Sequence, residues 1–316
     1  MQIHEVVEAS HFKKMLMMIG RRRPQDAGDV CIVIAAASGN LIDALTAKEW
    51  FGGFRQVVGF VTDSYWTEEI PLEVRRNRIF DHIFITSEED LPEWRRKVGT
   101  RISCLPWGSD ALDLGSATTQ RTWDILRVGR QPPEWDDDER NQSAAASLAL
   151  SYHPRPSGSD DWRENQALVM RAYASSKFLL AFSNRVHRSE HTHPSREYLT
   201  GRWTDALACG AIVAGIPPRA PSIDALLWPE ALLDLGTTNL RDGMAVIRDA
   251  ASRWSPGLAT LNHLRALEKL DWRWRLSDMA DTIGLKSNRL DAEMNRLRAR
   301  ISEMKLLISQ ASPARD

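Results

Sequence analysis

The sequence has few cysteines, no long apolar run and almost no excess charge, and each shortage excludes a class of protein. Cys31, Cys104 and Cys209 are the three cysteines, an odd number, and they lie in apolar runs without paired or metal-type spacing. We expect small buried hydrophobic side chains in a reducing compartment. The net charge of −1 provides no overall field that would attract a nucleic acid, so none is expected as a partner.

Targeting and membrane signals are also missing. Lys13 and Lys14 interrupt the apolar stretch at the N-terminus, and no small-residue cleavage site follows them. The longest apolar runs fall well short of the roughly 20 residues that a membrane span requires. We therefore expect a cytoplasmic protein without a transmembrane segment.

Two common nucleotide-binding fingerprints are absent as well. Gly39 stands alone in the turn Ser38-Gly39-Asn40, so the Gly-x-Gly-x-x-Gly pattern of nicotinamide and flavin enzymes is lacking. No Walker lysine motif occurs either. These absences argue against a dinucleotide-dependent enzyme and a P-loop kinase, and we expect no cofactor.

Short apolar runs that end in small or polar turn residues recur along the chain. Such runs are typical of parallel strands that are covered by helices on both faces. After an amphipathic helix over residues 1–19, the first series of expected strands lies at residues 29–37, 56–62, 79–86 and 101–105, with a helix at 41–50. The second series lies at residues 123–128, 148–152, 177–183, 211–215 and 232–235, with helices at 161–175, 221–227 and 239–253 and another ending at Gly210. The pattern predicts an α/β protein with two Rossmann-like domains.

The C-terminal tail has a different pattern, that of an amphipathic helix. Its apolar residues follow the heptad spacing of a coiled coil: Leu290, Met294, Leu297, Ile301, Met304 and Ile308. About three heptads is the low end for a coiled coil. Two interpretations stay open, a helix packed back on its own domain and a homodimer formed through residues 290–308.

The most informative stretch runs from residue 193 to residue 215. A polar loop with Arg196 and Thr200 leads into a helix that begins near Gly201 and ends at Gly210. A helix N-terminus presents free N–H groups and a positive dipole end, which suit a phosphate. Arg196 and Arg202 could hold a diphosphate bidentately. Glu197 and Asp205 could flank the same ligand.

This stretch resembles the donor-binding domain of GT-B glycosyltransferases. Many of those enzymes carry Glu-x7-Glu followed by Ala-Leu/Met-Ala-Cys/Ser-Gly, and here Glu197-x7-Asp205 is followed by the residues 206–210, Ala-Leu-Ala-Cys-Gly. The sequence looks most similar to the group related to the spore-maturation protein CgeB. Val128-Gly129-Arg130, the Pro-x-Gly-x-Asp hinge pattern at 106–110 and the Asp-Trp-x-x-Arg pattern at 271–275 also match.

The resemblance implies a fold, an activity and roles for particular residues. It implies an acceptor domain over residues 1–110, a donor domain over 111–285 and a C-terminal helix over 286–316. The reaction would move a sugar from a nucleoside-diphosphate donor such as a UDP-sugar to an acceptor hydroxyl, without metal. Asp205 would hold the ribose, Glu197 the sugar or its 3- and 4-hydroxyls, and Arg130 the diphosphate.

Three departures from the family pattern bear on these roles. Aspartate replaces the second glutamate and shortens its reach by one methylene. The lysine often found shortly after Val-Gly-Arg is missing, and Arg155, Arg196 or Arg202 could supply its charge. The N-terminal half is also short for a GT-B acceptor domain.

The catalytic base and a metal site are less well defined by the sequence. Asp63 at the end of a predicted strand is the best candidate for a base, although such aspartates often only cap a turn. His187, Glu190, His191 and His193 have spacings that a metal could use, but no fourth histidine or cysteine ligand is evident. We therefore predict no metal site.

Two alternative functions share the predicted fold. One is a nucleotide-sugar epimerase, and the other is a non-catalytic nucleotide-sugar-binding or assembly subunit. Donor hydrolysis separates the three possibilities. A transferase slowly releases sugar to water, an epimerase returns an isomer, and a silent binder does neither.

Overall fold

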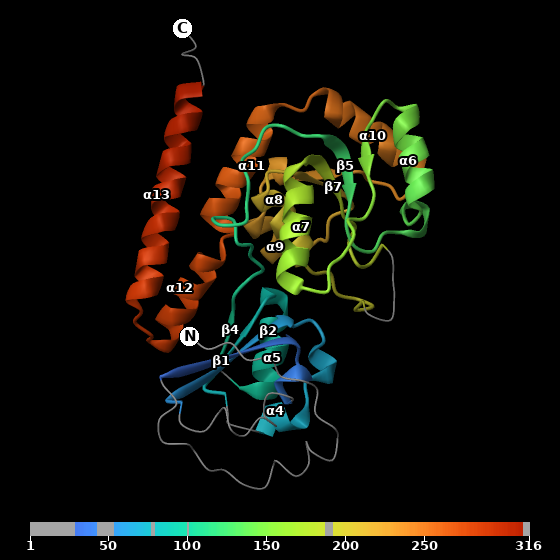
Figure 1. The fold of residues 1–316 in the computed structure, drawn as a ribbon. Helices are drawn as coiled ribbons and strands as arrows, with labels where there is room; N and C mark the ends of the chain where they lie inside the picture. Colours follow the sequence, from blue (N-terminus) through green and yellow to red (C-terminus); the bar gives the residue numbers. More distant parts are fainter. Residues whose placement is uncertain (1–28, 43–53, 77–79, 100, 187–191, 312–316) are drawn as a thin grey trace. The chain divides into compact units, whose positions relative to one another are not determined.

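The computed structural model describes residues 29–42, 54–76, 80–99, 101–186 and 192–311 (Figure 1). The helix predicted over 1–19, most of the helix predicted over 41–50, and His187, Glu190 and His191 lie outside these residues. The chain divides into two compact units, residues 1–106 and 107–316. No helix of the described residues combines the length and the apolar character needed to cross a membrane.

The first unit contains a four-stranded parallel sheet. Its strands lie side by side in chain order: β1 (Val30–Ala37), β2 (Gln56–Asp63), β3 (His82–Ile85) and β4 (Ile102–Cys104). Between the strands lie the helices α4 (Leu72–Arg76) and α5 (Leu91–Val98) and the 3-10 turns η2 (Thr67–Glu69) and η3 (Glu88–Asp90). Trp94 of α5 is completely buried, and its indole N–H donates to the carbonyl oxygen of Ser64 at 2.8 Å. The four strands predicted for this half are thus present.

The second unit contains a five-stranded parallel sheet with the order β6-β5-β7-β8-β9. The strands are β5 (Trp123–Arg127), β6 (Tyr152–His153), β7 (Ser176–Leu180), β8 (Ile212–Gly215) and β9 (Leu232–Asp234). The helices are α6 (Asp138–Ser147), α7 (Trp162–Ala174), α8 (Gly201–Ala208), α9 (Pro221–Leu226), α10 (Leu240–Ser252), α11 (Pro256–Lys269), α12 (Trp272–Ile283) and α13 (Asn288–Ala311), with 3-10 turns η4 (Pro133–Trp135) and η5 (Pro229–Ala231). Counted along the chain, the strand order is 2-1-3-4-5, one of the two common doubly wound arrangements.

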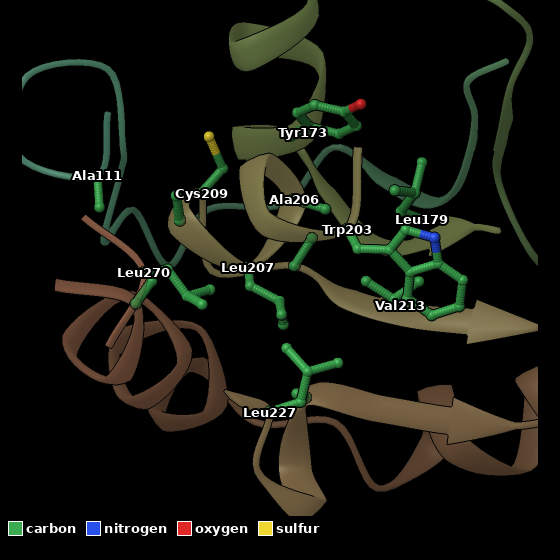
Figure 2. Packing of buried hydrophobic residues seen from close by; sticks show 14 of the residues in the cluster. Ala111, Tyr173, Leu179, Trp203, Ala206, Leu207, Cys209, Val213, Leu227 and Leu270 are labelled. Carbon is green, nitrogen blue, oxygen red and sulfur yellow. The ribbon is translucent and has the colours of Figure 1, made fainter. Parts of the chain in front are cut away.

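Both faces of this second sheet are buried, as its nearly continuous apolar strands predict. Neighbouring strand residues point to opposite faces: Leu179 packs with α7, α8 and α11, whereas Phe178 packs with α6 and α10. Figure 2 shows the first of these clusters, in which Trp203 and Leu207 of α8 lie against the sheet. Helix α8 is therefore fixed by its apolar face, and its N-terminal end is held in one position.

The strand predicted at 148–152 is wrong in its first half. Leu148 and Leu150 donate their N–H groups to the carbonyl oxygen of Ala145, so they close helix α6, and the strand spans only Tyr152–His153. A short apolar run fits a buried helix end as well as a strand, and the period cannot separate them. The sequence patterns also did not predict α11. Of the three cysteines, only Cys209 is buried, while Cys31 and Cys104 are half-buried.

The heptad seam of the C-terminal helix is buried inside its own unit. Met294, Leu297, Ile301 and Met304 of α13 are at most 9% exposed, and Leu297 shares a cluster with Leu267 of α11. This packing agrees with the interpretation of a helix packed back on its own domain. The homodimer through residues 290–308 stays a prediction.

We expect Leu297→Ala to lower the free energy of unfolding by about 2–5 kcal/mol, the usual effect of a cavity at a fully buried leucine. Leu307→Ala, on the same helix but 53% exposed, should change it by less than about 0.5 kcal/mol. Denaturant unfolding measures both. A melting temperature of the wild type that rises with protein concentration would instead indicate the dimer.

Candidate functional site

The strand order of the second sheet defines where a ligand would bind. From β5 the chain crosses to β6 on one side and then returns to β7 on the other side. In doubly wound sheets, ligands bind outside the carboxyl ends of the strands at such a switch point. A ligand is therefore expected beside the segments that follow β5 and β7.

A small pocket lies at this position, with a cavity volume of about 50 Å³ that opens to solvent. Three segments supply its walls: the residues after β5, those after β7 and the loop that enters α8. The lining residues are Arg130, Gln131, Pro132, Phe182, Ser183, Asn184, Thr192, Tyr198, Thr200, Arg202 and Trp203. Of the residues predicted from the sequence, the pocket brings together Arg130, Thr200 and Arg202.

The guanidinium of Arg202 joins the three segments. Its Nη1 donates to the carbonyl oxygen of Arg130 at 3.1 Å, and its Nη2 donates to that of Phe182 at 3.4 Å. A Cβ atom at Gly129 would lie 2.9 Å from Nη1, the movable end of the arginine side chain. Gly129 also has a φ of 76°, a conformation that favours glycine. The glycine of the Val-Gly-Arg motif is thus needed for the shape of the pocket.

The electrostatics of the pocket favour an anion. Burial lowers the pKa of Arg202, and the charge of Arg130 acts in the same direction, so two cations lie close together. No carboxylate of the described residues forms an ion pair with Arg202. An arginine retains its charge even when buried, so a negatively charged ligand would relieve the repulsion between the two side chains.

The N-terminus of α8 supports the same conclusion. Its first turn contains no acidic residue and does contain Arg202, although a helix N-terminus favours negative charge. Thr200 occupies the N-cap position in an extended conformation, yet its side chain does not cap the helix. The free N–H groups and the positive end of the helix are therefore available to a phosphate.

Four residues of the lining carry buried polar atoms without a hydrogen-bond partner. The atoms are Gln131 Oε1, Asn184 Oδ1, Thr200 Oγ1 and Arg202 Nε, four of the ten such side-chain atoms in the described part of the chain. A buried polar group left unpaired costs about 1–3 kcal/mol. Their concentration around one pocket is what a site has when a bound molecule, water or ligand, supplies the missing partners.

The two predicted carboxylates have different surroundings. Glu197 Oε1 accepts a hydrogen bond of 2.5 Å from the hydroxyl of Ser183, which lines the pocket. Asp205 lies outside the lining: its Oδ1 accepts from Ser109 Oγ at 2.7 Å and its Oδ2 accepts from Gln166 Nε2 at 3.0 Å. Burial raises the pKa of the Asp205 carboxyl, and these two hydrogen bonds offset only part of that effect.

The remaining predicted residues lie apart from the lining. Gly201 begins α8 beside Trp107, and Arg155 is exposed in the segment after β6. The backbone carbonyl of Arg196 accepts from Asn184 Nδ2 at 2.7 Å. Asp63 ends β2 in the first unit, where burial raises the pKa of its carboxyl and a hydrogen bond with Tyr65 opposes the shift.

His193 orders the loop that precedes α8. Its Nδ1 accepts hydrogen bonds from the backbone N–H groups of Ser195 at 3.2 Å and Arg196 at 3.1 Å. Within the described residues there is no group of three or more histidine, cysteine or acidic side chains suited to a metal ion. The two hydrogen bonds to its Nδ1 give His193 a role in loop conformation.

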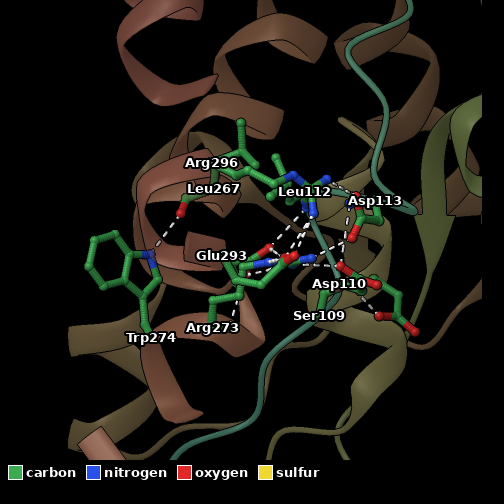
Figure 3. Close-up of polar contacts among 11 residues, drawn as sticks. Ser109, Asp110, Leu112, Asp113, Leu267, Arg273, Trp274, Glu293 and Arg296 are labelled. Atoms are coloured by element: carbon green, nitrogen blue, oxygen red, sulfur yellow. Dashed lines mark hydrogen bonds and ion pairs between the residues drawn. The ribbon is translucent and has the colours of Figure 1, made fainter. Parts of the chain in front are cut away.

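The hinge pattern at 106–110 and the Asp-Trp-x-x-Arg pattern at 271–275 contact one another (Figure 3). Ser109 pairs with Asp271 as a short parallel bridge, and Asp271 caps both α12 and the turn at Leu112. Arg273 forms ion pairs with Asp110, Asp113, Asp271 and Glu293. Although burial lowers the pKa of Arg273, the hydrogen bonds and charges of these acids raise it well above its usual value.

This arrangement connects the segment at 107–113 with helix α8. Thr204 Oγ1 donates to the carbonyl oxygen of Gly108 at 2.7 Å, and Ser109 donates to Asp205. A Cβ atom on Gly108 would lie 2.7 Å from the carbonyl oxygen of Leu270, so glycine is required there. Both patterns consequently brace the helix whose N-terminus forms the pocket.

Comparisons with known proteins agree with this fold. No protein-family model matches the chain, and no curated protein matches it in sequence. Among solved structures, the pneumococcal O-GlcNAc transferase GtfA in complex with UDP and GlcNAc is similar, with a TM-score of 0.53 and 13% sequence identity. The similarity covers 86% of this chain and 58% of GtfA, so the chain spans little more than half the length of that protein.

Two further solved structures match less well. Sucrose-phosphate synthase from Thermosynechococcus elongatus has a TM-score of 0.47 at 15% identity, covering 80% of this chain and 72% of that one. Anabaena HepE in complex with UDP and glucose has a TM-score of 0.48 at 13% identity, covering 80% and 77%. The conclusion rests on GtfA: the chain has the fold of GT-B glycosyltransferases, which confirms the predicted fold class.

We expect Arg273→Met to lower the free energy of unfolding by about 3–5 kcal/mol, because Asp271 would remain buried without its cation. Arg265→Met, which removes a half-exposed ion pair with Glu268, should cost no more than about 1 kcal/mol. Equal losses in denaturant unfolding would contradict the bracing role of Arg273.

A second prediction concerns pH and Asp205. Because its folded pKa is raised, the stability that the carboxyl contributes is present below its unfolded pKa of about 3.9 and is lost as pH rises through the folded pKa. The stability of the wild type relative to Asp205→Asn should therefore fall as pH rises above the unfolded pKa of about 3.9. Denaturant unfolding at increasing pH measures the difference, and a constant or rising value would show that the carboxyl titrates normally.

Proposed function

We propose that the chain is a glycosyltransferase that moves a sugar from a nucleoside-diphosphate donor to an acceptor hydroxyl in glycan, polysaccharide or natural-product assembly. One observation carries the proposal: the pocket at the switch point combines Arg202, Arg130 and the N-terminus of α8 around unpaired buried polar atoms. GtfA, which shares the fold, was solved with UDP, and this supports a UDP-sugar as the donor.

The chemistry needs the charge arrangement of this pocket. When the bond between the sugar and the diphosphate breaks, negative charge develops on the departing phosphate. Preorganised arginines and helix N–H groups stabilise such charge in a site that excludes water. We therefore propose a metal-independent reaction without a cofactor, in which Arg130 and Arg202 both face the diphosphate. Arg202 would then supply the charge that the missing lysine provides in related enzymes.

The finer roles follow the resemblance to the group related to CgeB. Glu197, held by Ser183 beside the pocket, would contact the sugar, and Asp205 would contact the ribose while keeping its bond to Ser109. A carboxylate oxygen can accept two hydrogen bonds, so Asp205 retains acceptor capacity. Arg155 and Arg196 stay predicted donor contacts. Asp63 is the proposed base of an inverting route, since a raised pKa makes a carboxylate more basic.

The test is a thermal-shift screen with UDP and several UDP-sugars, because a ligand that binds only the folded chain raises its melting temperature. At a concentration of 100 times Kd, the stabilisation is about 2.7 kcal/mol. Arg130→Ala should weaken UDP binding by about 10- to 100-fold, the usual effect of losing a hydrogen bond to a charged group. Because Arg130 is exposed, the unliganded melting temperature should barely change.

Arg253→Ala is the matched control, since this exposed arginine directly follows α10, lies outside the pocket lining and should leave binding unchanged. Absence of a shift with every nucleotide would overturn the proposal. Binding without slow donor hydrolysis would favour the silent binder, and recovery of an isomeric nucleotide sugar would favour the epimerase.

A further inference from the structure

Two side-chain amides of the pocket are held in one orientation by the backbone. Gln131 follows Arg130 after β5, is only 1% exposed, and its Nε2 donates to the carbonyl oxygens of Val128 at 3.2 Å and Leu180 at 3.1 Å. Asn184 follows β7, and its Nδ2 donates to the carbonyl oxygens of His193 at 3.3 Å and Arg196 at 2.7 Å. Each amide nitrogen thus uses both of its hydrogens.

These bonds determine which atom of each amide remains without a partner. Rotating either amide by 180° would bring its oxygen against two backbone carbonyl oxygens, and all of these atoms are acceptors. The carbonyl oxygens, Gln131 Oε1 and Asn184 Oδ1, are buried and accept no hydrogen bond. Two residues of the pocket lining therefore carry buried acceptors of fixed orientation.

The chemistry of these acceptors restricts what can satisfy them. An amide oxygen needs a hydrogen-bond donor, and the diphosphate of a nucleotide sugar carries no proton at neutral pH. Sugar hydroxyls are donors, and a glycosyl group would lie next to the diphosphate that Arg130 and Arg202 attract. The neighbours of the two amides agree with this position: Gln131 directly follows Arg130, and Asn184 directly follows Ser183, which binds Glu197.

On the basis of the proposed function, we propose that Gln131 and Asn184 determine donor specificity by accepting hydrogen bonds from two hydroxyl groups of the transferred sugar. A donor that lacks a hydroxyl at either position leaves a buried amide oxygen unpaired. Sites built to bind a hydroxyl group discriminate strongly against analogues that lack it, because the buried polar group loses its partner. The pocket accordingly selects a hydroxyl-rich hexose over a deoxy sugar and over UDP alone.

The decisive variant is Gln131→Lys, which keeps a donor for the carbonyl groups of Val128 and Leu180 but has no acceptor. The probes are UDP, UDP-glucose, UDP-galactose and UDP-N-acetylglucosamine, with Kd measured by calorimetry. The preference is the ratio of the Kd for UDP to the Kd for the UDP-hexose that the wild type binds best. We expect this ratio to be about tenfold lower in Gln131→Lys than in the wild type. Affinity for UDP itself should be equal or higher, because the lysine adds a positive charge.

Gln142→Lys on α6 makes the same exchange at an exposed position outside the lining and should leave every Kd unchanged. If Gln131→Lys does not fold, Gln131→Met removes the acceptor without adding charge and should reduce the preference similarly. Monodeoxy analogues of the best UDP-hexose complete a double-mutant cycle. Removing the hydroxyl that contacts Gln131 should raise Kd by about tenfold in the wild type and leave it unchanged in the variant.

Each negative result has a separate meaning. If the wild type binds UDP and every UDP-hexose equally, or if Gln131→Lys weakens UDP and UDP-hexose by the same factor, the specificity role is wrong and the donor site stands. In that second case, equal weakening of UDP and UDP-hexose would assign the acceptor of Gln131 to the nucleoside part, which all the probes share. If the wild type binds no nucleotide at all, the proposed function itself fails.

Discussion

The guanidinium of Arg202 reaches from the first turn of α8 to the carbonyl oxygens that follow β5 and β7, and the pocket forms where these three segments meet. A buried cation bound only to neutral carbonyl groups is costly, because the dipoles compensate only part of its lost hydration. The fold retains it beside Arg130, whose charge adds repulsion. An anionic ligand is the simplest partner that would offset both the lost hydration of Arg202 and its repulsion with Arg130. The unpaired atoms around the pocket favour a bound molecule at the same place.

The position of α8 depends on contacts on its other side. Its apolar face packs into the larger cluster, while Thr204 and Asp205 bind the segment that carries Gly108 and Ser109. That segment is held in turn by Asp271 and by the ion pairs of Arg273 with Asp110 and Asp113 (Figure 3). Several residues that the family resemblance singles out thus support the ligand site without lining it. Changes in this region are expected to alter stability first and ligand affinity only through the position of the helix.

Much of the fold and part of the candidate site were predictable from local patterns. Continuous apolar runs predicted both parallel sheets, and the turn at Gly210 predicted the end of α8, where a φ of 76° favours glycine. Arg130, Thr200 and Arg202 were identified because motif spacing places them beside strand and helix ends. Gln131 and Asn184 were missed, because a polar residue in a loop carries no signal of burial. The one local hint was that each lies a few residues after the end of a strand, β5 for Gln131 and β7 for Asn184.

By itself, the sequence determined the periodic features: most of the runs that form strands, where α8 begins and ends, and the apolar seam of α13. These depend on the repeat of side chains along one element, which is a property of neighbouring residues. Only the tertiary structure decided that the seam packs on α11 and that Asp205 faces Ser109 and Gln166. It also decided which amide oxygens remain unpaired. Those outcomes depend on contacts with distant segments of the chain. The spacing of residues along one segment does not specify which distant residue makes the contact.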